Sequence, residues 1–155
     1  MRPEERVGEL LRSKRLTLSL AESCTGGLVA SLITDVPGSS GYFLASLVTY
    51  DNGSKEKLLG VLSSTLLDHG AVSEATAREM AAGARLATGA DIGLSITGIA
   101  GPGGATASKP VGLVHFALDA SGEVTVDRAV FPGDRAAVKQ AAAEHALEML
   151  IRRLS

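Results

Sequence analysis

The chain has 155 residues and a formal net charge of −2 at pH 7, with 45% hydrophobic and 21% charged side chains. This size suits one domain whose core needs no disulfide or metal, and we expect a single domain over residues 1–155. A slightly acidic chain with no tryptophan, two tyrosines and three phenylalanines lacks the basic patch and stacking aromatics of most nucleic-acid binders. We therefore expect no nucleic-acid partner.

Several other classes of protein are disfavoured by the same sequence. No apolar run approaches the ~20 residues of a membrane span, and the N-terminus lacks the pattern of a signal peptide. The single cysteine, Cys24, excludes an internal disulfide, and no Cys/His group has the spacing of zinc ligands. We expect a cytoplasmic protein with no membrane partner, no metal and no cofactor.

The first third of the chain predicts alternating helices and strands. Apolar residues recur at helical spacing over Pro3–Lys14, which predicts an amphipathic helix, and they alternate over Leu16–Leu20, which predicts a strand. A helical stretch follows over Leu28–Ile33. A loop rich in Gly, Ser and Pro at Asp35–Gly41 then leads into a predicted strand at Tyr42–Tyr50.

The remaining elements predict the fold class. They are a turn at Asp51–Lys55 that opens a short helix, an alanine-rich helix with a capping box from Thr76 to Glu79, a strand at Ile92–Thr97, two strands at Val111–Leu118 and Val124–Phe131 joined at Ser121–Gly122, and a final helix from Pro132–Arg135. This order predicts an α/β fold, a three-layer α/β/α sandwich with a mixed, mostly parallel sheet.

Three loops follow predicted strands, at residues 23–27, 50–55 and 97–104. In open α/β sheets such loops gather on one edge and form the ligand crevice. We therefore expect these loops to build one pocket.

Ser23 is the candidate nucleophile, because it lies at the turn between a predicted strand and helix. The N–H groups of Thr25, Gly26 and Gly27 are the expected donors to an oxyanion or to a substrate phosphate. Residue type alone favours a helix N-cap for Ser23, since serine is common at that position. Both interpretations stay open at this point.

A serine nucleophile needs a base, and no histidine lies in these loops. Lys55 does, and a Ser–Lys pair is a known variant of the catalytic triad if the lysine pKa falls below its unperturbed ~10.4. Residue type favours instead a solvated lysine on an exposed turn, and Tyr50 is equally consistent with an ordinary strand residue. Cys24 is more consistent with a buried thiol than with a thiolate nucleophile.

The glycine-rich loop at Gly98–Gly104 has neither the Walker A ending nor the Rossmann spacing. Its glycines let the backbone approach a ligand closely, so Thr97, Gly98 and Gly101 are candidate substrate contacts. Arg135 opens the last helix, where the dipole disfavours a cation. It is therefore either half of an anion clamp or an ordinary surface arginine.

Seven segments of the chain together resemble the CinA C-terminal domain family. They are, in the family's order, Ala-Glu-Ser-Cys-Thr-Gly-Gly, Asp-Val-Pro-Gly-Ser-Ser, Val-Thr-Tyr-Asp-Asn-Gly-Ser-Lys with Leu-Leu-Gly-Val after it, His-Gly-Ala-Val-Ser-Glu, Thr-Gly-Ile-Ala-Gly-Pro-Gly-Gly, Lys-Pro-Val-Gly and Pro-Gly-Asp-Arg. The resemblance implies a nicotinamide-nucleotide amidohydrolase, which converts nicotinamide mononucleotide into nicotinate mononucleotide and ammonia. It also implies a homodimer and a role in NAD recycling.

The resemblance also implies roles for individual residues. Ser23 corresponds to the nucleophile and Lys55 to its base, while Tyr50 assists proton transfer or orients the pair. The family often has Tyr-Ser-Asn-Glu-Ala-Lys where this chain has Tyr-Asp-Asn-Gly-Ser-Lys, so Asn52 is retained and is a candidate substrate contact. Many members carry a larger N-terminal domain resembling molybdopterin-binding proteins, and we expect this chain to be the stand-alone form.

Two alternative functions remain open from the sequence. One is a non-catalytic nucleotide-binding module linked to competence or the DNA-damage response. The other is a structural or partner-binding subunit, which would carry a large apolar surface patch. Retention of Ser23, Tyr50 and Lys55 together favours the enzyme, because phosphate binding needs none of these side chains in particular.

Overall fold

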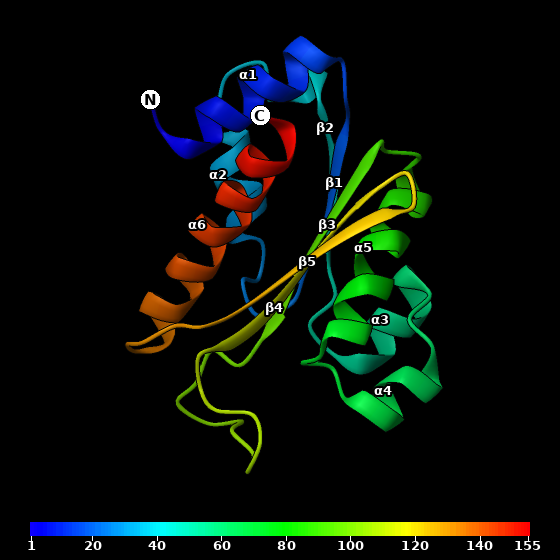
Figure 1. The fold of residues 1–155 in the computed structure, drawn as a ribbon, viewed down its shortest axis with the longest axis vertical. Helices are drawn as coiled ribbons and strands as arrows, with labels where there is room; N and C mark the ends of the chain where they lie inside the picture. The colour runs from blue at the N-terminus through cyan, green and yellow to red at the C-terminus, as the bar shows by residue number, and fades with distance from the viewer.

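The computed structural model describes residues 1–155 and has a five-stranded sheet between two groups of helices (Figure 1). The elements are α1 (Pro3–Lys14), β1 (Leu18–Glu22), α2 (Leu28–Thr34), η1 (Ser39–Gly41), β2 (Phe43–Val48), α3 (Asn52–Leu59), α4 (Ser63–His69), α5 (Glu74–Thr88), β3 (Ile92–Gly98), β4 (Leu113–Ala120), β5 (Glu123–Val130) and α6 (Arg135–Leu154). The predicted α/β fold is confirmed.

The sheet is mixed, with strand order β2-β1-β3-β4-β5. Strand β1 pairs in parallel with β2 and β3, whereas β4 pairs antiparallel with β3 and β5. The predicted hairpin at Ser121–Gly122 is the β4–β5 turn. Because β2, β1 and β3 are parallel, their carboxyl ends meet at one edge, where ligand crevices form in such sheets.

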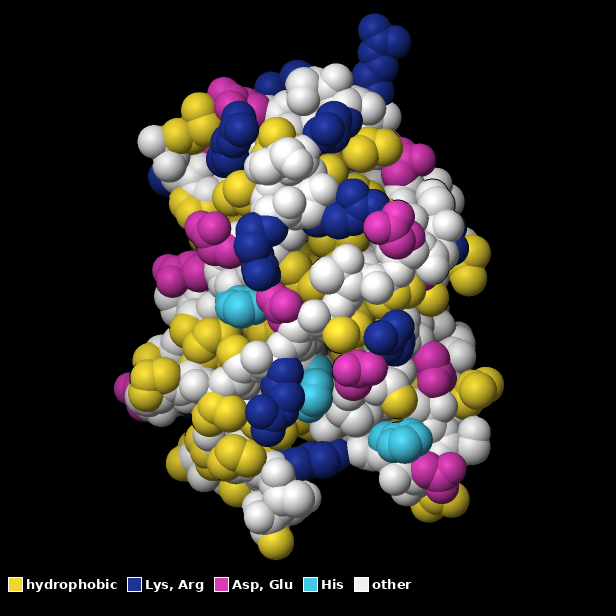
Figure 2. Space-filling view, viewed as in Figure 1, with side chains coloured by type: hydrophobic (Ala, Val, Ile, Leu, Met, Phe, Trp, Pro, Cys, Tyr) yellow, Lys and Arg dark blue, Asp and Glu magenta, His cyan; other side chains and the backbone are white.

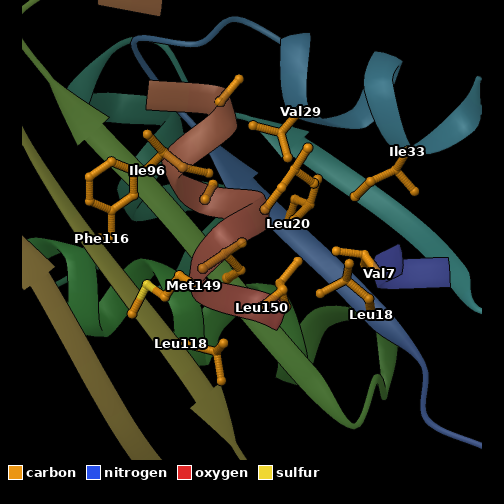
Figure 3. Close-up of a cluster of buried hydrophobic side chains, with 14 of the residues drawn as sticks. Val7, Leu18, Leu20, Val29, Ile33, Ile96, Phe116, Leu118, Met149 and Leu150 are labelled. Atoms are coloured by element: carbon orange, nitrogen blue, oxygen red, sulfur yellow. The ribbon is translucent and has the colours of Figure 1, made fainter. Parts of the chain in front are cut away.

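Helices α1, α2 and α6 cover one face of the sheet and α3, α4 and α5 cover the other (Figure 1). Figure 3 shows the core under α1, α2 and α6, where side chains of these helices meet those of β1, β3 and β4. The labelled side chains are Val7, Leu18, Leu20, Val29, Ile33, Ile96, Phe116, Leu118, Met149 and Leu150. This apolar layer fixes β1, and with it the turn that carries Ser23.

On the opposite face, small residues bring α5 close to its neighbours, as the alanine-rich pattern of this helix predicts. Ala77 and Ala81 of α5 are fully buried, and a Cβ atom added at Gly83 would collide with the carbonyl oxygen of Leu59 at the end of α3. A Cβ atom at Gly93 of β3 would likewise collide with the carbonyl oxygen of Ala81. Helix α5 therefore touches both α3 and β3 through backbone atoms, which sets the position of α3 over the sheet.

The predicted capping box at Thr76 and Glu79 is wrong. Helix α5 begins at Glu74, and the side chain of its N-cap, Ser73, accepts the N–H of Thr76 at 3.1 Å. Glu79 instead accepts the hydroxyl of Thr65 at 2.6 Å. Thr65 belongs to α4, a short helix that the apolar pattern did not predict, so Glu79 ties α4 to α5.

The surface mixes both signs of charge. Figure 2 shows basic and acidic side chains interspersed on one face of the molecule, in keeping with a net charge of −2. None of the helices combines the length and apolar character that crossing a bilayer requires.

Candidate active site

The structure brings Ser23 and Lys55 into direct contact. Ser23 follows the last residue of β1, and Lys55 lies in the first turn of α3. The Nζ atom of Lys55 donates to Ser23 Oγ at 3.0 Å and to the carbonyl oxygen of Thr49 at 2.6 Å. Lys55 is 1% exposed and Ser23 is 8% exposed, so the interpretation of Lys55 as a solvated surface charge is wrong.

The surroundings of Lys55 favour its neutral form. Burial lowers the pKa of its ammonium, while the nearby Asp51 carboxylate raises it to a smaller extent. No ion pair of the structure includes Lys55, and Asp51 is occupied in capping α3, where it accepts the N–H of Ser54 at 2.8 Å. A lysine with a lowered pKa is a better candidate for a general base than a solvated lysine.

Ser23 is not a helix cap, so that interpretation is also wrong. The N-cap position of α2 is Gly27, at φ 103°, and no side chain caps the helix from there. The buried carboxylate of Glu22 serves instead, and it accepts four hydrogen bonds of 2.7–3.2 Å. Its donors are Thr25 Oγ1, Val29 N, Ala30 N and Ser46 Oγ.

Glu22 is the functional residue that the sequence analysis missed. It anchors both ends of the Ser23 turn, because its partners lie in that turn, in α2 and in β2. The one signal in the sequence is an acidic residue inside an apolar stretch, directly before Ser23. Buried carboxylates are rare unless they are paired or hydrogen-bonded, which makes such a residue informative.

The predicted oxyanion donors are only partly available. The N–H of Gly26 donates to the carbonyl oxygen of Ser23 at 3.1 Å, so the prediction for this group is wrong. The N–H groups of Thr25 and Gly27 donate no hydrogen bond within the protein. The hydroxyl of Thr25 is occupied by Glu22 at 2.7 Å.

A pocket of about 250 Å³ opens over the Ser23–Lys55 pair, and the three predicted loops supply most of its walls. Three predicted site residues, Thr25, Gly26 and Gly27, do not line it. The predicted residues that do are Ser23, Tyr50, Asn52, Lys55, Thr97, Gly98, Gly101 and Arg135.

Arg135 holds the outer wall of this pocket. Its guanidinium donates to Tyr50 Oη at 2.6 Å and to the carbonyl oxygen of Gly101 at 2.7 Å. From an exposed position, it therefore links the loop after β2 to the glycine-rich loop after β3. Tyr50 forms no hydrogen bond to Ser23 or Lys55 and is 61% exposed.

Two further side chains of the pocket, those of Cys24 and Thr97, have surroundings that fix the protonation of the first and the hydrogen bond of the second. Cys24 is 5% exposed, and burial raises its pKa to about 11, so it is a thiol at neutral pH. The hydroxyl of Thr97 donates to the carbonyl oxygen of Ala71 at 2.8 Å, which fixes the end of β3. No histidine lines the pocket, and no three His, Cys, Asp or Glu side chains of the chain cluster as metal ligands would.

The fold and this site define an α/β protein with a buried serine–lysine pair where the parallel strands of a mixed sheet end. A model of the CinA C-terminal domain matches residues 2–154, and the chain belongs to that family.

The regions matched by related proteins cover most of this chain. A CinA-like protein from Geobacter sulfurreducens is 53% identical over 148 residues, which is 96% of this chain and 36% of that protein. A protein from Desulforudis audaxviator, described as competence-damage inducible, is 56% identical over 137 residues, which is 88% of this chain and 33% of that protein. The chain spans about a third of the length of these curated relatives.

Solved structures share the same fold. A CinA superfamily protein from Klebsiella pneumoniae superimposes with a TM-score of 0.95 at 35% identity, covering 99% of this chain and 98% of that one. A competence/damage inducible protein from Agrobacterium tumefaciens gives a TM-score of 0.92 at 42% identity, covering 97% and 94%. The sequence resemblance to the CinA family is thus confirmed over nearly the whole chain.

Proposed function

We propose that the chain is an amidohydrolase that converts nicotinamide mononucleotide into nicotinate mononucleotide and ammonia through an acyl-enzyme on Ser23. The 3.0 Å contact between Lys55 Nζ and Ser23 Oγ, two almost completely buried side chains at the floor of the pocket, carries the proposal. The chain belongs to the CinA C-terminal domain family, and the proposed substrate class is the one that the resemblance to this family implies.

In the first step, the neutral amine of Lys55 accepts the proton of Ser23 while Oγ attacks the carboxamide carbon. The amine keeps an N–H on the carbonyl oxygen of Thr49, at 2.6 Å, which holds its lone pair toward Ser23. The substrate carbonyl oxygen becomes an oxyanion, and backbone N–H groups around the pocket are its donors. Losing one such donor typically costs on the order of 100-fold or more in rate.

In the second step, the Lys55 ammonium protonates the amide nitrogen, the C–N bond breaks and ammonia leaves. Water then gives a proton to Lys55 and attacks the acyl carbon, and the Ser23 Oγ–carbon bond breaks as Lys55 returns a proton to Ser23. Tyr50, held by Arg135 at the same pocket, orients the substrate or assists the proton transfer to the leaving nitrogen. We expect the active protein to be a homodimer.

A non-catalytic nucleotide-binding module is the competing function, and two of the similar proteins are named for competence and damage. The Ser23–Lys55 contact favours the enzyme. Burying a lysine costs free energy because its ammonium loses water. Nucleotide binding alone does not require a buried lysine that contacts a serine hydroxyl.

The test is release of ammonia and nicotinate mononucleotide from nicotinamide mononucleotide at neutral pH, with a chelator present. We expect release by the wild type and none by Ser23→Ala. Ser64→Ala, at an exposed serine of α4, is the matched control and should keep full activity. In the quenched wild type, mass spectrometry should find the acyl group on the Ser23 peptide. Equal release by wild type and Ser23→Ala, or none by either, refutes the proposal.

A further inference from the structure

A second and larger hollow adjoins the catalytic pocket. Its volume is about 990 Å³, and Arg135 and Ala100 line both cavities. Leu28, Val111 and Lys139 line only the larger one. The two cavities are thus neighbouring compartments with Arg135 on their common border.

The catalytic pocket alone is small for a nucleotide. Its 250 Å³ falls below the range of about 300–1,000 Å³ typical of small-molecule sites. It suits the reacting carboxamide and the ring that bears it. The rest of a nucleotide must therefore extend beyond this pocket. The larger cavity on the other side of Arg135 is already formed in the structure and can receive it.

Lys139 is the cation of the larger compartment with no partner. Its side chain takes part in none of the ion pairs of the structure and forms no hydrogen bond. Its ammonium lies 3.7 Å from the position of a Cβ atom at Gly26, so it faces the turn that carries Ser23. Arg135, by contrast, is engaged by Tyr50 and Gly101.

The charges of the compartment favour an anion. Its lining has two cations, Arg135 and Lys139, and one carboxylate, Asp134. Asp134 caps α6, where it accepts the N–H of Ala137 at 2.9 Å. The apolar walls that include Leu28 and Val111 lower the effective dielectric constant around Lys139, which strengthens its pairing with an anionic group.

We propose that the larger compartment binds the ribose phosphate of the substrate, with the Lys139 ammonium paired to the phosphate. This inference rests on the proposed function, because the carboxamide must lie at Ser23. It makes the chain selective for a phosphorylated nucleotide over the corresponding nucleoside. Lys139 is then a residue that determines specificity and takes no part in the bond-breaking steps.

The test measures binding separately from turnover. Calorimetry with Ser23→Ala protein compares nicotinamide mononucleotide with nicotinamide riboside, which lacks the phosphate. In the Ser23→Ala background, Lys139→Gln should raise the Kd for the mononucleotide by about tenfold or more, because one charge-assisted hydrogen bond is lost. The Kd for the riboside should stay unchanged. Lys139→Arg should restore most of the loss, and Lys14→Gln, at an exposed lysine at the far end of α1, should change neither.

Each outcome separates the two proposals. Equal binding of both ligands by the Ser23→Ala protein, or equal weakening of both by Lys139→Gln, overturns the phosphate site even if the wild type releases ammonia. Selective weakening of the mononucleotide supports the site even if no ammonia is released, in which case only the catalytic proposal fails. Absence of binding by either ligand, with ammonia released by the wild type, also overturns the phosphate site.

Discussion

Two side-chain pairs of opposite character border the catalytic pocket. Ser23 and Lys55 are almost completely buried, whereas Tyr50 is 61% exposed in its contact with Arg135. Burial gives Lys55 a lowered pKa and hence a base at the nucleophile. The Tyr50–Arg135 contact is open to water, which weakens such interactions. The comparison teaches that the proposed proton transfer between Ser23 and Lys55 depends on burial, whereas the contribution of the Tyr50–Arg135 pair does not.

Lys55→Met breaks the buried pair and should have the largest effect. Loss of a general base lowers kcat by about 10²–10⁴-fold, and methionine fills a similar volume without a base. Steady-state release of ammonia measures the loss, with circular dichroism to verify folding. Lys57→Met, on the exposed side of the same helix, should keep wild-type activity. Comparable losses in both variants would contradict a specific role for Lys55.

Glu22→Gln removes the anchor of the buried pair. The amide has one acceptor oxygen where the carboxylate has two, so one or two of the four buried donors lose their partner. We expect the free energy of unfolding to fall by about 2–4 kcal/mol, measured by urea denaturation, together with a lower kcat. Glu148→Gln, at an exposed position of α6, should shift the urea midpoint little. An unchanged midpoint for Glu22→Gln would show that the four contacts contribute no net stability.

Tyr50→Phe and Arg135→Gln break the exposed pair and should have smaller effects. We expect each to lower kcat/KM by about tenfold or less, with little change in stability, because the contact is exposed to solvent. The double variant should lose little more than the worse single variant, since both changes remove the same hydrogen bond. Fully additive losses would mean that the two side chains act independently.

The pH dependence of kcat/KM tests whether Lys55 is the base, and the shift expected from Asp51→Asn is the smallest of the predicted effects. Only the neutral amine accepts the Ser23 proton, so kcat/KM should rise with pH as Lys55 deprotonates, with a midpoint below the ordinary lysine value of 10.5. Asp51→Asn removes a charge that raises the Lys55 pKa, yet asparagine still caps a helix. The rising limb should therefore move to lower pH. A shift to higher pH would contradict the assignment of the limb to Lys55.

Most of the fold could be predicted because most of its helices, strands and turns have a recognisable pattern in their own stretch of sequence. The amphipathic α1, the alternating β1 and β3, and the turn at Ser121–Gly122 each carry their own pattern. Helix α4 and the start of α5 could not be predicted in the same way. Glu79 matched a local capping pattern, but its partner Thr65 lies 14 residues away in another helix, so a contact between helices decided its role.

In the candidate site, too, local sequence predicted some features, whereas others depend on contacts that form only on folding. Its loops were predictable, because parallel strands end at one edge of a sheet. The roles of Ser23 and Lys55 were not settled by residue type, since the burial of Lys55 depends on the packing of α3 and not on its neighbours in sequence. Glu22 was missed because three of its four donors come from α2 and β2, a convergence that exists only in the folded chain.

The contact between Gly83 and Leu59 has a consequence for where mutations can harm this protein. Leu59 lies one helical turn after Lys55, at the C-terminal end of α3, so a backbone contact at the end of its own helix helps to place the base. Adding a single methyl group at Gly83 would push α3 outward and draw the amine away from Ser23. A substitution at Gly83, which lines no part of the pocket, should therefore impair the catalytic pair from a distance.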